Sequence, residues 1–253
     1  MGKEKFNMVF LSALLVSTTC AAKVTDPTDS VQQVMEEKKY NMRLVTRLSS
    51  QGQFNYGGRL VSPNPTFDFN FNYDRKGWGI QIFKAMDLRD RTTDINFMLA
   101  VVNKSFHFGK KITMTPSVGF ILEQNRTAAD KGSDAAIILT TGYKISKTLT
   151  LEHSSLMGNV LLETSECDWV NRFRLLYSKK HIDMAAMVWH NNRVFDDTEY
   201  VTCGVNAVYN RVKVSQAVSL SAGFTVLAMP YNSNPEIIPQ RNGVIFTIAA
   251  TFD

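Results

Sequence analysis

The sequence predicts an all-β fold: a closed antiparallel transmembrane β-barrel of about 12 strands. Three observations support this prediction. The segment 66–74 alternates aromatic and polar residues throughout, many other segments alternate in the same way, and the connections between them are short and long in turn. Membrane barrels combine these features because one face of each strand meets lipid, the other meets the lumen, and the turns are short at one end only.

The segment 66–74 has the clearest pattern in the chain. Phe67, Phe69, Phe71 and Tyr73 fall on one face of a strand, because side chains alternate between faces with a period of two, and the polar residues Asp68, Asn70, Asn72 and Asp74 fall on the other. A soluble sandwich would place the aromatic face against a second sheet. A barrel would place it in lipid.

The amino terminus has the features of a secretory signal peptide over residues 1–22. Lys3 and Lys5 precede a short apolar run, which ends in the small residues Ala21 and Ala22. The run is too short to span a bilayer, and no apolar run of about 18 residues follows it. Residues 23–40 are polar and predict a periplasmic arm with a short helix, and residues 41–253 predict the barrel.

The strands are predicted from alternation and from a length that suits a tilted bilayer crossing of about 9–11 residues. They are 41–50, 66–74, 77–87, 93–108, 111–123, 135–145, 148–157, 168–178, 181–190, 199–211, 216–228 and 243–252. The predicted short turns are 74–77, 109–111, 145–148, 177–181 and 211–216. The predicted longer loops are 51–65, 123–134, 158–167, 191–198 and 229–242, and only 88–92 is short among the connections on that side.

The two strand faces have different compositions. Apolar residues predict the lipid face, for example Ile112, Met114, Val118, Phe120 and Leu122, and the alternating residues 201–209 and 218–226. The lumen face receives Asn96, Thr113, Thr115, Ser117, Thr202, Asn206, Ser219, Ser221 and Thr225. Near strand ends, Trp78, Tyr143, Trp169, Tyr177 and Tyr209 predict interfacial aromatic girdles.

Three residues fit this pattern less well. Ile138 and Leu176 place apolar side chains on the lumen face. Pro116 lies within a strand, where a closed barrel has no free edge for a residue without an N–H, so we expect a bulge there.

Composition excludes some functions. The formal charge of +5 falls to +4 without residues 1–22, which hold two Lys and one Glu, and the basic residues are scattered, so we expect no nucleic-acid partner. Cys167 and Cys203 are too few for a disulfide framework. The four His residues lack metal-ligand spacing, so no metal site is predicted.

At this level the chain resembles bacterial outer-membrane β-barrel proteins. Its last strand alternates Val244, Phe246, Ile248, Ala250 and Phe252, similar to the closing strand of that class, although Asp253 follows where the class usually ends on the aromatic residue. The resemblance implies an outer-membrane location, with outer-membrane lipid and the barrel-assembly machinery as partners.

The first functional hypothesis is a passive porin-like channel for small polar or charged solutes, without a cofactor. The lumen face would hold Arg43, Arg47, Arg172 and Arg174 as cations, and Asp68, Asp94, Glu123 and Glu152 as anions. Charges in such positions select solutes in pores. The alternative is that these charges pair across a narrow lumen and close it.

The second hypothesis is an ester hydrolase on the lipid face. His153 and Ser155 share the face of Leu151, and a hairpin register that pairs Leu151 with Leu175 sets Asn171 opposite Ser155. A hydroxyl, an imidazole base and an orienting group are the parts of a nucleophilic site.

This set resembles outer-membrane phospholipase A, and the His-x-Ser pair also resembles that of the lipid A deacylases. The resemblance implies Ser155 as nucleophile, His153 as base, Asn171 as orienting residue and calcium as cofactor. Phospholipase A has Asn-Gly after its serine, where this chain has Leu156-Met157, and its pair comes earlier in the strand order. The alternative is that His153 and Ser155 are ordinary polar residues at the headgroup level.

Overall fold

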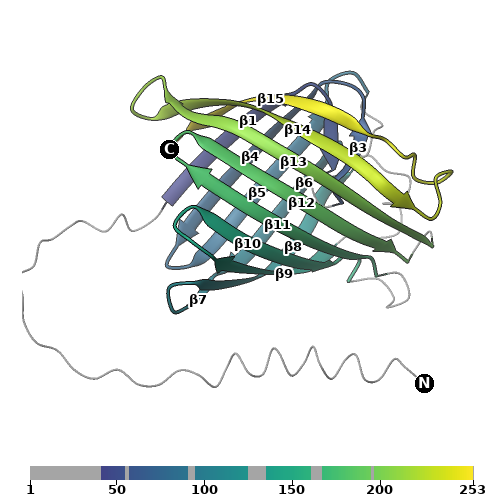
Figure 1. The fold of residues 1–253 in the computed structure, drawn as a ribbon, viewed down its shortest axis with the longest axis horizontal. Coiled ribbons are helices and arrows are strands. Elements are labelled where there is room, and N and C mark those ends of the chain that lie inside the picture. The colour runs from purple at the N-terminus through teal and green to yellow at the C-terminus, as the bar shows by residue number, and fades with distance from the viewer. Residues whose placement is uncertain are drawn as a thin grey trace, which may run out of the picture. The chain divides into compact units, whose positions relative to one another are not determined.

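The computed structural model describes residues 41–54, 57–90, 95–124, 135–160, 167–194 and 197–252, and of residues 121–124 and 211 it describes the backbone alone. The chain divides into two units, Met1–Glu37 and Lys38–Asp253. The predicted signal peptide 1–22 and arm 23–40 lie outside the described residues. The barrel is built from the second unit (Figure 1).

Within the described residues the elements are all β-strands. They are β1 Asn41–Ser49, β2 Gly52–Phe54, β3 Arg59–Ser62, β4 Thr66–Arg75, β5 Trp78–Asp87, β6 Phe97–Lys104, β7 Phe106–Phe108, β8 Ile112–Gln124, β9 Ala135–Lys144, β10 Leu149–Met157, β11 Trp169–Lys179, β12 Ile182–Arg193, β13 Thr198–Lys213, β14 Val218–Asn232 and β15 Gly243–Phe252.

All of these except β2 and β3 form one antiparallel sheet that closes on itself. β1 pairs with β15 on one side, where Leu44 faces Phe252, and with β4 on the other, where Leu44 faces Phe71. β6 and β7 both pair with β8, so they act as one interrupted strand and the ring has 12 strands. The predicted closed 12-stranded barrel is confirmed.

The five predicted short turns join strands at one end of the barrel, which we call the turn end. Three of them contain residues with positive φ: Lys76 (49°) and Gly77 (78°) between β4 and β5, Gly109 (62°) between β7 and β8, and Lys180 (52°) between β11 and β12. Two consecutive positive φ angles define a tight hairpin turn whose twist matches that of the strands. The longer connections lie at the opposite, loop end.

The prediction of a bulge at Pro116 is wrong. Asn103 pairs with Ser117 and Phe106 with Met114, so the register between β6–β7 and β8 is the same on both sides of the proline. The ladder is simply interrupted at Ser105, whose N–H binds the carbonyl oxygen of Gly77 at 2.8 Å. The register shift in this pair of strands lies at Met98/Leu99 instead.

The connection between β5 and β6 is longer than predicted, because β6 begins at Phe97 rather than at residue 93. Asn96 therefore precedes the strand. Its side chain accepts a hydrogen bond from the N–H of Asp87 (2.9 Å) and donates one to the carbonyl of Asp90 (3.0 Å), which ties the start of β6 to the end of β5.

The outer face of the barrel is apolar, as predicted. Phe120, Val205, Phe224, Phe246 and Ile248 are each more than 40% exposed, as are the predicted girdle residues Trp78, Tyr143 and Tyr209. A water-soluble protein rarely exposes so continuous an apolar surface.

Cys167 and Cys203 are both free, so no disulfide links them.

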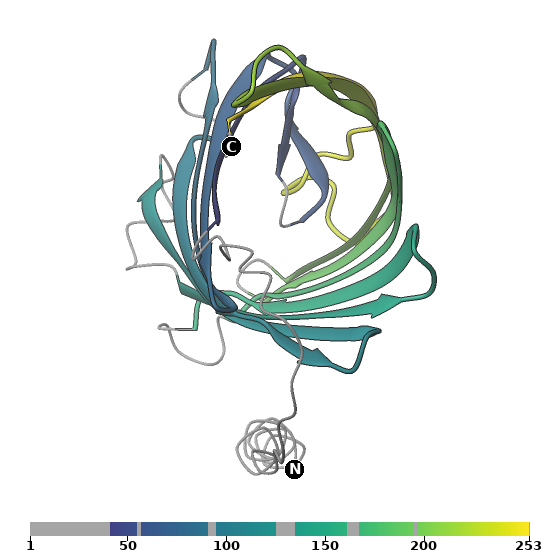
Figure 2. The ribbon, with the colours of Figure 1, turned by 90° about the vertical axis from the view of Figure 1, so that its left-hand side faces the viewer.

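The hairpin β2–β3 lies inside the barrel (Figure 2). The segment 51–65 was predicted as an external loop, and the structure corrects this: Leu60 is buried with Trp189, Leu227 and Ile245 of the wall. On the other side, Val61 packs against the buried cluster Phe83, Ala85, Ile95, Phe97, Leu99 and Val101. The apolar inner face of β5 and β6 therefore receives part of the hairpin.

Candidate functional site

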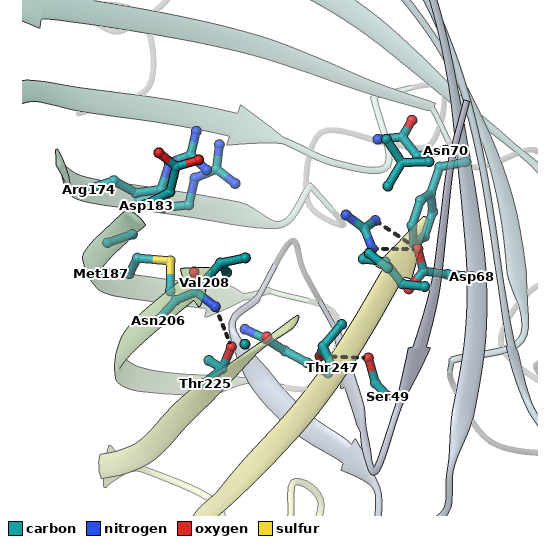
Figure 3. Close-up of a pocket in the computed structure, with 18 of the residues that line it drawn as sticks. Ser49, Asp68, Asn70, Arg174, Asp183, Met187, Asn206, Val208, Thr225 and Thr247 are labelled. Carbon is teal, nitrogen blue, oxygen red and sulfur yellow. Dashed lines mark hydrogen bonds and ion pairs between the residues drawn. The ribbon is translucent and has the colours of Figure 1, made fainter. Parts of the chain in front are cut away.

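The lumen holds a cavity of about 870 Å³. Side chains of nearly every strand line it, and Gln51 and Gln53 at the start of the hairpin line it as well. Four of the predicted lumen charges belong to this lining: Arg47, Asp68, Arg172 and Arg174. Figure 3 shows Asp68 and Asn70 facing the cavity from one wall, and Arg174 and Asp183 from the opposite one.

Arg47 and Asp68 form one ion pair of the lumen. They are directly opposite each other in the β1–β4 register, and the Nε and Nη2 atoms of Arg47 each lie 2.7 Å from Oδ1 of Asp68. The side chains are 32% and 14% exposed, so the pair is partly screened from water. Two hydrogen bonds from one guanidinium group to one carboxylate fix the orientation of both side chains.

On the opposite wall, Glu152 binds two arginines. The Nε atom of Arg174 donates to Oε1 of Glu152 at 2.8 Å, its Nη2 binds the same oxygen, and Nη2 of Arg172 lies 3.4 Å from that oxygen. Arg172 also donates to the hydroxyl of the buried Ser154 (3.2 Å), which is hydrogen-bonded to Thr140 at 2.9 Å. A polar network thus fixes both guanidinium groups on the cavity wall.

The other predicted lumen charges have different outcomes. Arg43 lies on the same face of β1 as Arg47, nearer the turn end, and is exposed. Glu123 lies in β8, but its side chain is not among those described, and Asp94 lies outside the described residues. Sequence reasoning missed Asp183, which lines the cavity near the turn end and accepts hydrogen bonds from Ser178 and Asn210.

The lumen wall also carries apolar side chains. Ile138 and Leu176, the two residues that seemed out of place in the sequence, do line the cavity, and so do Leu156 and Val170. Ile138, Leu156 and Val170 are consecutive partners across β9, β10 and β11. This apolar row reaches the hairpin, because Val170 packs against the buried cluster that contains Leu60.

Hydrogen bonds to its backbone anchor the hairpin to the wall. The carbonyl oxygen of Gly57 accepts bonds from Asn191 Nδ2 (3.1 Å) and Thr202 Oγ1 (3.0 Å), and both side chains are about 1% exposed. Arg241 donates to the carbonyl of Val61 at 2.9 Å. A buried acceptor without a partner costs free energy, so these bonds favour the docked hairpin.

Gly58 is required at the closest approach of the hairpin to the wall. Its φ is +70°, and a Cβ atom there would lie 2.3 Å from Cδ2 of Trp189 and 2.6 Å from Oγ1 of Thr202. Only glycine combines that backbone conformation with that proximity. The pair Gly57-Gly58 between two short alternating segments is the signal that could have predicted the hairpin.

The proposed catalytic residues lie on the outer wall. The β10–β11 register pairs Leu151 with Leu175 and Ser155 with Asn171, as the sequence predicted. The ring of His153 stacks on that of Phe173, with centroids 4.5 Å apart. Among the described residues, no hydrogen bond joins His153, Ser155 and Asn171 to one another. The described residues also contain no group of three or more His, Cys, Asp or Glu side chains that could hold a metal ion.

No protein-family model and no curated protein matches this sequence. Solved structures do match it. The KdgM porin has a TM-score of 0.56 at 8% identity, over 83% of this chain and 98% of that one. A bacterial polysaccharide outer membrane secretin has a TM-score of 0.46 at 8% identity, over 84% of this chain and 97% of that one. OccAB3 of Acinetobacter baumannii has a TM-score of 0.42 at 9% identity, over 86% and 65%.

The chain is an outer-membrane β-barrel. Its turn end is therefore periplasmic and its loop end extracellular, because barrels of this class have short periplasmic turns and longer outer loops. Identities of about 8% relate the folds alone. The barrel resembles porins and channels in its fold.

Proposed function

We propose that this barrel is a passive channel for small polar or charged solutes, narrowed by the β2–β3 hairpin. The observation that carries the proposal is the cavity of about 870 Å³ inside the closed barrel, with Arg47, Arg172 and Arg174 along it. Charged side chains along such a cavity would influence which solutes pass.

The arginines support a role in solute selection. Arg47 and Arg174 both remain partly exposed while bonded to a carboxylate, at 32% and 28% of their side chains. A guanidinium group has five N–H donors, so one bound carboxylate leaves donors for a passing anion. Rings and ladders of such groups set ion preference in pores.

The experiment is conductance of the purified protein in planar lipid bilayers. Defined current steps, with a reversal potential in a salt gradient that reports anion preference, are the expected result. An absence of steps in preparations whose folding is shown by heat-modifiable gel migration would contradict the proposal, because the hairpin would then close the lumen.

The register of the outer wall favours a second candidate function, that of a calcium-dependent lipid ester hydrolase. Ser155 and Asn171 are direct cross-strand partners, and residues so paired lie about 5 Å apart. His153 would have to leave its stack on Phe173 to reach the Ser155 hydroxyl. Release of fatty acid from phospholipid or lipid A in detergent, and its loss in Ser155→Ala, tests this candidate.

A further inference from the structure

The outer wall of the barrel is not smooth. A groove of about 500 Å³ crosses β10 to β14 on the lipid-facing side, and its lining is almost entirely apolar. Small residues lie in its middle: Ala186 of β12, Cys203 of β13 and Ala228 of β14. Larger ones stand beside them, with Phe173 51% and Val205 46% exposed. A volume of this size is typical of a site for one small ligand.

A row of polar side chains borders the groove on its extracellular side. The register places Ser155 beside Asn171 and Asn171 beside His190, and the row continues through Val201 to Tyr231. The next row toward the periplasm runs from His153 through Phe173, Val188 and Cys203 to Ala228, most of which line the groove. The polar row and the groove are therefore adjacent on one face.

The polar row has unmet hydrogen-bonding capacity. His190 is bonded to Glu199 through Nε2 at 2.7 Å. In the described part of the chain, by contrast, the side chains of Ser155 and Asn171 have no hydrogen-bond partner. A polar group on a wall that faces hydrocarbon is destabilising unless it finds a hydrogen-bond partner there. A lipid bound to this wall can supply that partner.

We propose that this wall binds one lipid A molecule of the outer leaflet, with an acyl chain in the groove and the ester, amide or hydroxyl groups at the base of that chain bonded to Asn171 and Ser155. The groove lies beside the polar row, which is nearer the extracellular end of the strands, and the lipid of the extracellular leaflet of an outer membrane is lipid A. An acyl chain matches the apolar lining, and carbonyl and hydroxyl groups match an amide and a hydroxyl. The proposal does not rest on the channel function.

Native mass spectrometry of the folded protein in detergent tests the proposal, with lipid A added at a fixed ratio. The wild type should retain one lipid A. Ala186→Phe should lower retention at least tenfold, because the ring fills the groove, and Asn171→Ala should lower it severalfold. Ala100→Phe is the matched control and should retain lipid A, since Ala100 lies outside the groove on β6, between Ile82 and Phe120 of the outer wall. Heat-modifiable migration checks that each variant is folded.

Several outcomes would overturn the proposal. Equal retention by the wild type and Ala186→Phe would place any bound lipid elsewhere. Displacement of lipid A by an equal amount of phosphatidylethanolamine would show that the groove does not select lipid A. A dimer mass that Ala186→Phe abolishes would make a second copy of the chain the occupant, and shortened lipid A in the wild type alone would replace binding by hydrolysis.

Discussion

Replacing Gly58 with alanine should weaken the docking of the β2–β3 hairpin in the lumen while the barrel wall stays intact. The added Cβ atom would lie 2.3 and 2.4 Å from two ring carbons of Trp189 and 2.6 Å from the hydroxyl of Thr202. Trp189 is 2% exposed and packed with Leu227 and Ile245, so its ring has little space into which it can move.

The size of the effect follows from two contributions. An L-residue at φ +70° costs about 1–2 kcal/mol relative to glycine, and forcing a methyl group into a packed contact costs about 1–3 kcal/mol more. Their sum of roughly 3 kcal/mol changes the ratio of docked to released hairpin by about a hundredfold. The burial of Leu60, at about 1.5–3 kcal/mol, and the hydrogen bonds from Asn191, Thr202 and Arg241, at about 1 kcal/mol each, still favour docking. The released hairpin therefore becomes more frequent in the variant without becoming the main state.

The measurement is single-channel conductance in planar bilayers, where Gly58→Ala should give larger or more frequent open levels than the wild type. Gly109→Ala is the matched control. Its φ is +62°, so it carries a similar backbone cost, but no heavy atom lies within 4 Å of the added Cβ. Identical current records for Gly58→Ala and the wild type, with both folded, would refute the argument that the hairpin narrows the lumen.

Four further predictions concern charges, chemistry and the fold. Replacing the lumen arginines with serine should shift ion preference toward cations, and an unchanged reversal potential would count against the proposed channel. The residues to replace are Arg43, Arg47, Arg172 and Arg174. Glu152→Gln should shift the preference the opposite way, because it removes the carboxylate that Arg172 and Arg174 share. If the hydrolase candidate is correct, Ser155→Ala should abolish fatty-acid release, with a loss of several orders of magnitude in rate, and equal inertness of both proteins with and without calcium would exclude it. The folded protein should migrate differently on gels before and after heating, and recovery in the soluble fraction would be inconsistent with a membrane barrel.

The barrel itself could be predicted because its signals are local. In β4, β13 and β14, apolar and polar residues alternate, and alternation decides which face meets lipid. The tight turns carry glycine or lysine at the positions that need positive φ. Even the register that pairs Ser155 with Asn171 followed from one hairpin and the pairing of Leu151 with Leu175.

The interior could not be predicted in the same way. β6 reads Phe-Met-Leu-Ala-Val-Val over Phe97–Val102, apolar on both faces, so alternation cannot say that Leu99 and Val101 meet a hairpin. The partners of that hairpin, such as Trp189 and Arg241, are more than a hundred residues away in sequence. Pairing over such distances depends on the closed ring and leaves no periodic signal.

The location of those partners has a consequence for the order of assembly. The hairpin belongs to the first loop of the barrel, yet its carbonyl of Gly57 bonds to residues 134 and 145 positions later, and that of Val61 to one 180 positions later. None of these bonds can form until β12, β13 and the segment before β15 are in place. Contacts between residues so far apart in sequence form late, because the intervening chain must first be ordered. The pairing of β1 with β15, which closes the ring, spans about as much of the chain, so the hairpin docks late in folding, together with closure of the barrel.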